Sequence, residues 1–156
     1  MFQTRLRLAV ALTVGLATFP LLAQSEPKLL GTWVINVERS HFIDDPPKSY
    51  RRTYTLTSQG LVKAAYEVVY KDGTTASMSY TASFTDGKDY RFVGSRFGDT
   101  ISMTSRDPRT TDKVVKKSGV ITLTERSVVS TDGRTLTVTM LRPGATEAVI
   151  EVFDKQ

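Results

Sequence analysis

Turn signals recur about every 8 to 12 residues along most of this chain, and they separate short runs of β-branched and aromatic residues. Asp-Gly pairs stand at positions 72–73, 86–87 and 132–133. An Asp-Gly pair between two alternating runs is the strongest short-range signal of a β-hairpin. No segment after the first two dozen residues has a convincing helical period, so the chain is predicted to be all-β.

The runs themselves have the composition and period of strands. Between residues 77 and 84, Met78, Tyr80 and Phe84 alternate with serine and threonine, which is the period of two of a strand with one buried face. Proline lacks the donor that a ladder needs, so Pro46 and Pro47 place the segment 38–49 in an irregular loop. The expected strands are 29–37, 50–57, 61–71, 74–85, 90–93, 100–105, 113–117, 120–130, 134–141 and 146–154.

Consecutive hairpins give an antiparallel meander, which in an open sheet leaves two exposed edges. Closing the meander into a barrel removes both edges. We therefore expect a single antiparallel up-and-down β-barrel of about ten strands. A β-sandwich is the alternative, but its crossovers need longer connections than this sequence contains.

The N-terminus has the three-part pattern of a secretory signal peptide. Arg5 and Arg7 precede an apolar stretch over residues 8–19, and small residues follow at Ala23 and Ser25. The stretch is shorter than the roughly 20 residues that span a bilayer. We predict a signal peptide over residues 1–23, with cleavage near 23–25, and one domain over 24–156. The protein is then exported to the periplasm or the medium and has no stable membrane anchor.

Charge and cysteine content exclude several classes of function for that domain. Removal of the signal leaves 133 residues with a formal charge of +3, which is mild and does not indicate a nucleic-acid partner. The chain has no cysteine, which excludes thiol catalysis, zinc–cysteine sites and iron–sulfur clusters. The fold must hold by packing and hydrogen bonding alone, and we expect a monomer.

Four short motifs carry a resemblance to a known family. They are Gly31-Thr32-Trp33 in the first strand, Ser40-His41-Phe42 before the proline-rich loop, Gly87-Lys88-Asp89-Tyr90, and Asp154-Lys155-Gln156 at the end. Together they resemble the calycin superfamily of lipocalins and fatty-acid-binding proteins, and most of all its exported bacterial lipocalin-like members. The resemblance implies a barrel that holds a small hydrophobic molecule. It departs from the family at two places: only Asp89-Tyr90 matches the second lipocalin motif, and the loop after the first strand is too short for a helical lid.

The resemblance also implies a structural plug at one end of the barrel. Trp33 would close that end, and an arginine of the last strands would stack on its indole ring. Arg126 and Arg142 are both candidates for this arginine, and the sequence does not choose between them. Gly31 would let the chain approach closely beside the ring.

Aromatic residues at alternate strand positions are the candidate lining of a ligand cavity, because ligand pockets are mostly apolar with a few polar tips. Plain core packing explains the same pattern. Arg52 and Arg91 are candidates for an inward-facing cation that receives a polar head group. The aromatic candidates are Tyr54, Tyr66, Tyr70, Tyr80 and Phe84.

No catalytic or metal motif stands out. His41 is the only histidine and lies in a polar loop, which favours a solvated residue over a haem ligand or a general base. Asp44 and Asp45 lack the ligand spacing of a calcium loop. We expect no catalytic residue, no metal site and no cofactor.

These observations favour an exported, non-enzymatic protein that binds a small, largely hydrophobic ligand in its barrel. A second interpretation is a packed barrel that acts as an envelope interaction module or inhibitor, with His41–Lys48 or Arg106–Asp112 as the binding loop. A third is a barrel isomerase or cyclase.

Overall fold

The computed structural model describes residues 27–156, so the predicted signal peptide lies outside the described residues. Within them, no helix is long and apolar enough to cross a membrane. One 3₁₀ helix, η1 (Val37–Arg39), follows the first strand. The strands are β1 (Gly31–Ile35), β2 (Ser49–Leu56), β3 (Val62–Val69), β4 (Thr75–Ala82), β5 (Tyr90–Arg91), β6 (Thr100–Asp107), β7 (Thr110–Lys117), β8 (Val120–Val129), β9 (Thr135–Leu141) and β10 (Val149–Lys155).

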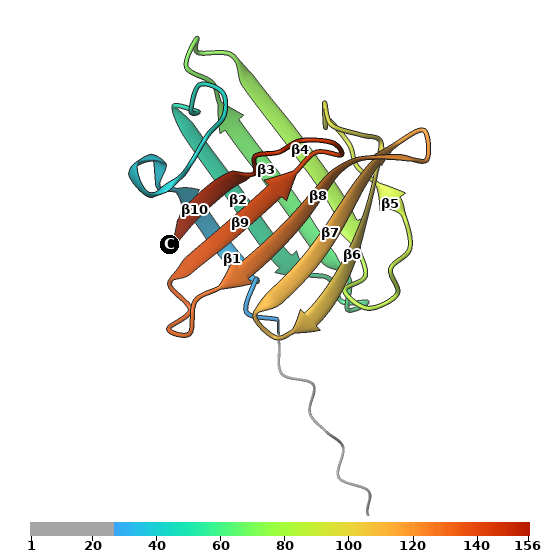
Figure 1. Ribbon diagram of the computed structural model, residues 1–156. Coiled ribbons are helices and arrows are strands. Elements are labelled where there is room, and N and C mark those ends of the chain that lie inside the picture. The colour runs from blue at the N-terminus through green and yellow to red at the C-terminus, as the bar shows by residue number, and fades with distance from the viewer. Residues whose placement is uncertain (1–26) are drawn as a thin grey trace, which may run out of the picture.

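All ten strands form one antiparallel sheet that curls into a nearly closed barrel (Figure 1). Their order around it is β4-β3-β2-β1-β10-β9-β8-β7-β6-β5. Strands that are consecutive in sequence are therefore paired, except β4 and β5, which form the two ends of the sheet, and β1 also pairs with β10. The predicted all-β meander barrel is therefore confirmed. The prediction works because short turns at regular spacing leave the chain few other ways to pair its strands.

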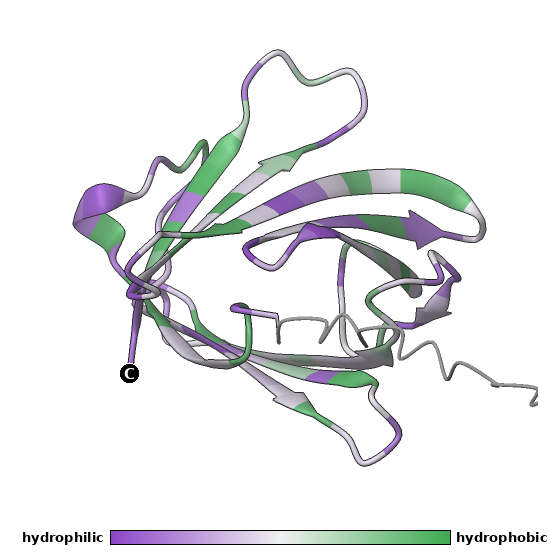
Figure 2. Cartoon of the chain, turned by 90° about the horizontal axis from the view of Figure 1, so that it is seen from below, coloured by the Kyte–Doolittle hydropathy of each residue, from purple (hydrophilic) through white to green (hydrophobic). Residues whose placement is uncertain are grey.

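Alternation along each strand separates the packed interior from the solvated surface. In β3, Val62, Ala64 and Tyr66 are buried, whereas Lys63 and Glu67 are exposed. Figure 2, which looks along the barrel from below, shows apolar and polar residues taking turns along the strands. The core is thus a single set of inward side chains contributed by all the long strands.

Trp33 lies near the start of β1 and closes the end of the barrel at which that strand begins, the lower end in Figure 1. This side chain is fully buried, and its indole Nε1–H donates a 2.8 Å hydrogen bond to the Leu29 carbonyl. Lys155 Nζ lies 5.0 Å from the centre of the ring. Gly31 has φ +126°, and a Cβ there would lie 2.9 Å from Lys155 Cε. Glycine therefore makes room for the lysine that covers the indole.

The prediction that Arg126 or Arg142 stacks on Trp33 is wrong. Arg126 is exposed on the outer face of β8 and forms an ion pair with Asp112 at 2.7 Å. Arg142 lies at the opposite end, 5.6 Å from the centre of the Phe97 ring. The last strand does supply the cation, but it is Lys155, which the register of the β1–β10 ladder places directly opposite Trp33.

The barrel closes along a seam between β4 and the segment after β5. One β-bridge, between Ser79 and Val93, joins the two sides, and the Ser105 N–H adds a bond to the Phe84 carbonyl. Gly94 follows the bridge with φ +73°, and a Cβ there would lie 2.1 Å from the Ser77 carbonyl oxygen. The seam therefore depends on a residue without a side chain.

Replacement of that glycine tests the seam directly. Gly94→Ala should lower the free energy of unfolding by about 3 kcal/mol, because strain at positive φ and a backbone clash both act. Gly133 has the same φ of +73° with nothing within 4 Å of a Cβ, so Gly133→Ala isolates the strain. Gly133→Ala should lower the free energy of unfolding by about 1 kcal/mol. Urea unfolding measures both variants. Equal losses of the free energy of unfolding would contradict a close backbone contact at Gly94.

Candidate functional site: an interior charge network below a cavity at the barrel mouth

Arg52 lies at the centre of the barrel interior and joins two carboxylates. Its side chain is 1% exposed. Nη1 donates to both oxygens of Glu125, each at 3.1 Å, and Nη2 donates to Glu151 Oε2 at 2.7 Å. Nε has no hydrogen-bond partner among the described residues. Strands β2, β8 and β10 are thereby linked across the interior.

Lys113 of β7 adds a second buried cation beside the first carboxylate. It pairs with Glu125 Oε1, and its ammonium also donates to Ser127 Oγ at 3.1 Å and to Tyr54 Oη at 3.3 Å. The Ser127 hydroxyl donates to Glu125 at 2.9 Å. Lys113 and Glu125 are direct partners in the β7–β8 ladder, so backbone register holds this pair together.

Aromatic rings surround the network. The Arg52 guanidinium carbon lies 4.8 to 4.9 Å from the ring centres of Tyr50, Tyr66 and Phe153. The hydroxyls of Tyr54, Tyr66 and Tyr80 form a chain with oxygen separations of 3.0 and 3.1 Å. Guanidinium stacking and a hydroxyl chain reduce the cost of burying charge in this position.

The two carboxylates differ in their acidity. Burial alone would raise the pKa of Glu125, but Arg52 and Lys113 outweigh it and bring that pKa down to about 2. Burial raises the pKa of Glu151, and Arg52 offsets this only in part, because the charge of Glu125 adds to the rise. For Lys113, burial lowers the pKa, yet the attraction of Glu125 raises it overall. Glu125 is thus ionised down to a low pH, whereas Glu151 has the higher pKa and is the weaker acid.

Above the network, the mouth of the barrel contains a cavity of about 130 Å³. Ten of the fifteen described residues around it are apolar or aromatic. These ten come from β2, β3, β4, β9 and β10 and from the loops 36–48, 70–74 and 92–99. Glu151 is shared between the cavity and the network, since it lines the first and is bound to Arg52 in the second. The apolar lining includes Tyr50, Val68, Tyr70, Met78, Phe97, Met140 and Val149.

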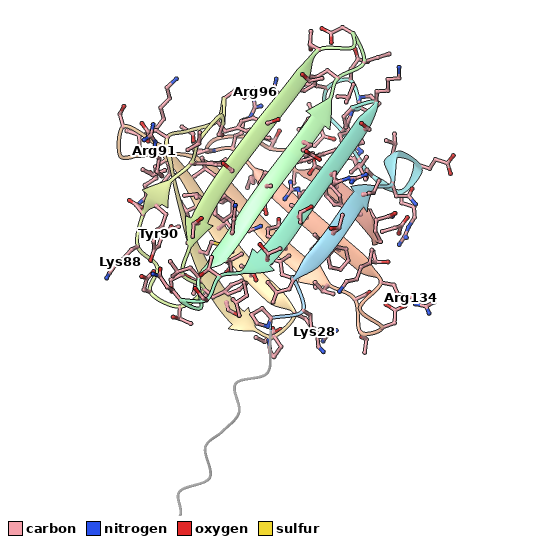
Figure 3. The ribbon with its side chains drawn as sticks, turned by 180° about the vertical axis from the view of Figure 1, so that it is seen from behind. Lys28, Lys88, Tyr90, Arg91, Arg96 and Arg134 are labelled. Atoms are coloured by element: carbon pink, nitrogen blue, oxygen red, sulfur yellow. The ribbon has the colours of Figure 1, made fainter. Side chains whose placement is uncertain are left out.

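Two arginines stand at the rim of the mouth cavity. Arg96 lies 5.0 Å from the centre of the Phe97 ring and 5.4 Å from that of Tyr70, and Figure 3 shows it at the upper end of the barrel. Arg142 lies 5.6 Å from the same Phe97 ring. Asp44 and Asp45 also line the rim, so both signs of charge are present there.

Two other hollows are larger but less suited to an apolar ligand. One, of about 470 Å³, lies against β1 to β4 and is bordered by Arg51, Glu67 and Ser77. The other, of about 450 Å³, lies at the lower end and is bordered by polar residues such as Arg106 and Asp107. Neither combines an apolar lining with a buried polar group as the mouth cavity does.

The sequence-predicted lining residues fall into three groups. Arg52, Tyr54, Tyr66 and Tyr80 are all buried in the interior, where they belong to the charge network rather than to the walls of the mouth cavity. Tyr70 lines that cavity. Phe84 borders the hollow at the lower end.

Arg91 is the exception, because the structure does not bring it to the interior. Its side chain is exposed, and Figure 3 shows it at the outer margin of the molecule. The prediction that it faces inward is wrong, since the buried position falls to the next residue, Phe92, directly after β5 ends.

Sequence reasoning missed Lys113, Glu125 and Glu151. Only Glu125 had a sequence signal: it lies in phase with Leu123 and Val129, which marks an inward position in β8. In β7 and β10, by contrast, both phases contain apolar residues, so alternation does not say which face is buried.

The loop residues considered for metal or acid–base chemistry lie at the surface. His41 is exposed, and its Nε2 is 2.7 Å from Glu147 Oε1. Asp45 pairs with Lys71. Within residues 27–156 no three histidine, aspartate or glutamate side chains are grouped to hold a metal ion.

Comparison with family models and with curated proteins finds no match to this chain. The fold itself, a nearly closed antiparallel barrel of ten strands, is compatible with a calycin-like architecture.

The low pKa of Glu125 predicts how stability depends on pH. The pKa lies near 2 in the folded state against an ordinary 4.5, so this stabilisation is complete above about pH 4.5 and is lost as the pH falls through 2. Glu125→Gln should therefore lower the free energy of unfolding at pH 7 by about 3 kcal/mol and flatten its decline in acid.

Glu67→Gln, on the exposed face of β3, is the matched control and should leave the curve of the unmodified protein nearly unchanged. Urea unfolding between pH 7 and pH 2 measures all three proteins. Parallel curves for Glu125→Gln and the unmodified protein would contradict the assigned pKa.

Proposed function

We propose that this protein is a non-enzymatic binding protein that holds one small, largely hydrophobic ligand, or the apolar end of a larger one, in the mouth of its barrel. The observation that carries the proposal is the mouth cavity, where apolar and aromatic walls end on a single buried carboxyl group. A few convergent polar groups in an otherwise apolar pocket are typical of ligand sites.

The size of the cavity limits what is bound. At about 130 Å³ it is close to an apolar cavity that holds benzene, and it is smaller than the pockets of drug-sized ligands. The network of Arg52, Lys113 and Glu125 fills the middle of the barrel and keeps a long chain from passing through it. The ligand therefore enters from the mouth end.

The filled interior also favours a second candidate, an envelope interaction module or inhibitor that binds through its loops. Val120 and Ile121, at the tip of the β7–β8 hairpin, are 67% and 45% exposed and would suit such a contact. An isomerase or cyclase has less support, because Tyr54, Tyr66 and Tyr80 do not border the mouth cavity. Export by the predicted signal peptide and descent from exported lipocalin-like proteins are part of the same proposal.

Native mass spectrometry of the protein purified from its own host, repeated after denaturation, tests the binding function. We expect a reproducible mass excess that denaturation releases. A bare polypeptide mass that stays unchanged after incubation with a panel of small apolar compounds would overturn the proposal in favour of the interaction module.

Two neighbouring substitutions locate the site. Val149 faces the mouth cavity, and Ile150 is 37% exposed on the outside of the same strand. Val149→Phe should fill the cavity and abolish the mass excess, whereas Ile150→Phe should keep it. Loss of the cargo in both variants, or in neither, would contradict a site in the mouth.

A further inference from the structure

Within residues 27–156, Glu151 is the one charged side chain that is buried and also borders the mouth cavity. Resting on the proposed function, we propose that Glu151 selects the ligand, and that this ligand is an uncharged, compact apolar molecule with one hydroxyl or N–H group that donates to the Glu151 carboxylate.

The free atom of the site is Glu151 Oε1. Oε2 accepts the 2.7 Å bond from Arg52 Nη2, which is the one hydrogen bond of the Glu151 carboxylate within residues 27–156, so Oε1 is left for a ligand. Arg52 holds the carboxylate in one orientation, because its second nitrogen is fixed on Glu125. Burial raises the pKa of Glu151, so its charged form lacks solvation that a donor from the ligand would supply. The floor of the cavity thus presents a single, oriented acceptor.

Charge balance in the interior argues for an uncharged partner. Arg52 and Lys113 carry two positive charges, and ionised Glu125 and Glu151 carry two negative charges. An added cation or anion would leave an unpaired charge among buried groups, which is costly. A carboxylate would in addition face the Glu151 carboxylate directly.

The aromatic walls argue further against a cationic ligand. A cation is attracted to the face of an aromatic ring, and here protein guanidinium groups already lie over such rings. Arg52 lies over Tyr50, and Arg96 lies over Tyr70 and Phe97. Three of the four aromatic residues around the cavity therefore carry a cation already.

Four para-substituted fluorobenzenes of nearly equal size test the selection, and fluorine NMR titration gives the affinity of each. They are 4-fluorophenol, 4-fluorotoluene, 4-fluorobenzoate and 4-fluorobenzylammonium. We expect 4-fluorophenol to bind about tenfold more tightly than the other three, the ratio typical of one hydrogen bond to a charged acceptor. Equal or tighter binding of any of the other three would overturn the proposal.

Glu151→Gln replaces one carboxylate oxygen by an NH₂ group while it preserves the shape of the side chain. Its amide oxygen can keep the bond from Arg52, and its NH₂ group then faces the cavity in place of the free oxygen. We expect 4-fluorophenol to lose about tenfold in affinity, while 4-fluorotoluene is unchanged. Glu67→Gln makes the same change on the exposed face of β3, away from the mouth cavity, so it is the control and should change neither. Equal losses for both probes would mean that Glu151 only supports the fold, and would overturn the selection.

The design separates the inference from the proposed function. If 4-fluorotoluene binds as well as 4-fluorophenol and Val149→Phe abolishes both, the cavity binds ligands but Glu151 does not select them. If none of the four probes binds in a manner sensitive to Val149→Phe, the proposed binding function fails and the selection fails with it. The comparison on the unmodified protein is decisive even if Glu151→Gln does not fold.

Discussion

The buried bridge from Arg52 to Glu125 and Glu151 is the interaction on which the interior of this barrel depends. A charge in a protein interior is tolerated only when it is paired and hydrogen-bonded, and loss of one partner leaves the other exposed to the full desolvation cost. Because each member comes from a different strand, the bridge requires that β2, β8 and β10 be in register. It also fills the space that an open barrel would leave for a ligand, so the proposed ligand has room only in the mouth cavity.

Glu125 and Glu151 differ in their roles because they have different neighbours. Glu125 meets two cations and a hydroxyl, which makes it a strong anion that belongs to the structure. Glu151 meets one cation and keeps one oxygen free, which makes it suited to recognition. A mutation of the first is therefore expected to affect folding, and a conservative mutation of the second is expected to affect selectivity.

Much of the fold could be predicted from the sequence, because turn chemistry and alternation are local properties. Asp-Gly pairs and alternating runs located ten strands, and the meander order followed from short connections. The charge network was harder, because it depends on which face of a strand turns inward, and β7 and β10 contain apolar residues in both phases. The partner of Trp33 was missed for a similar reason: ladder register, and not residue type, brings Lys155 beside it. Arg52 was found because a basic pair on a strand must place one member inside.

The position of β10 between β1 and β9 has a consequence for the order of folding. Every other ladder in the sheet joins consecutive strands, but the β1–β10 ladder joins the two ends of the described chain and pairs Ile35 with Phe153. Closing so long a loop is the largest entropic cost of any contact in the sheet, and such non-local contacts slow folding. The sheets β1–β4 and β5–β10 can each form hairpin by hairpin, but β1 gains its second neighbour, and Arg52 its bond to Glu151, only when β10 pairs with β1. The final step of folding thus completes the sheet and the floor of the mouth cavity at the same time.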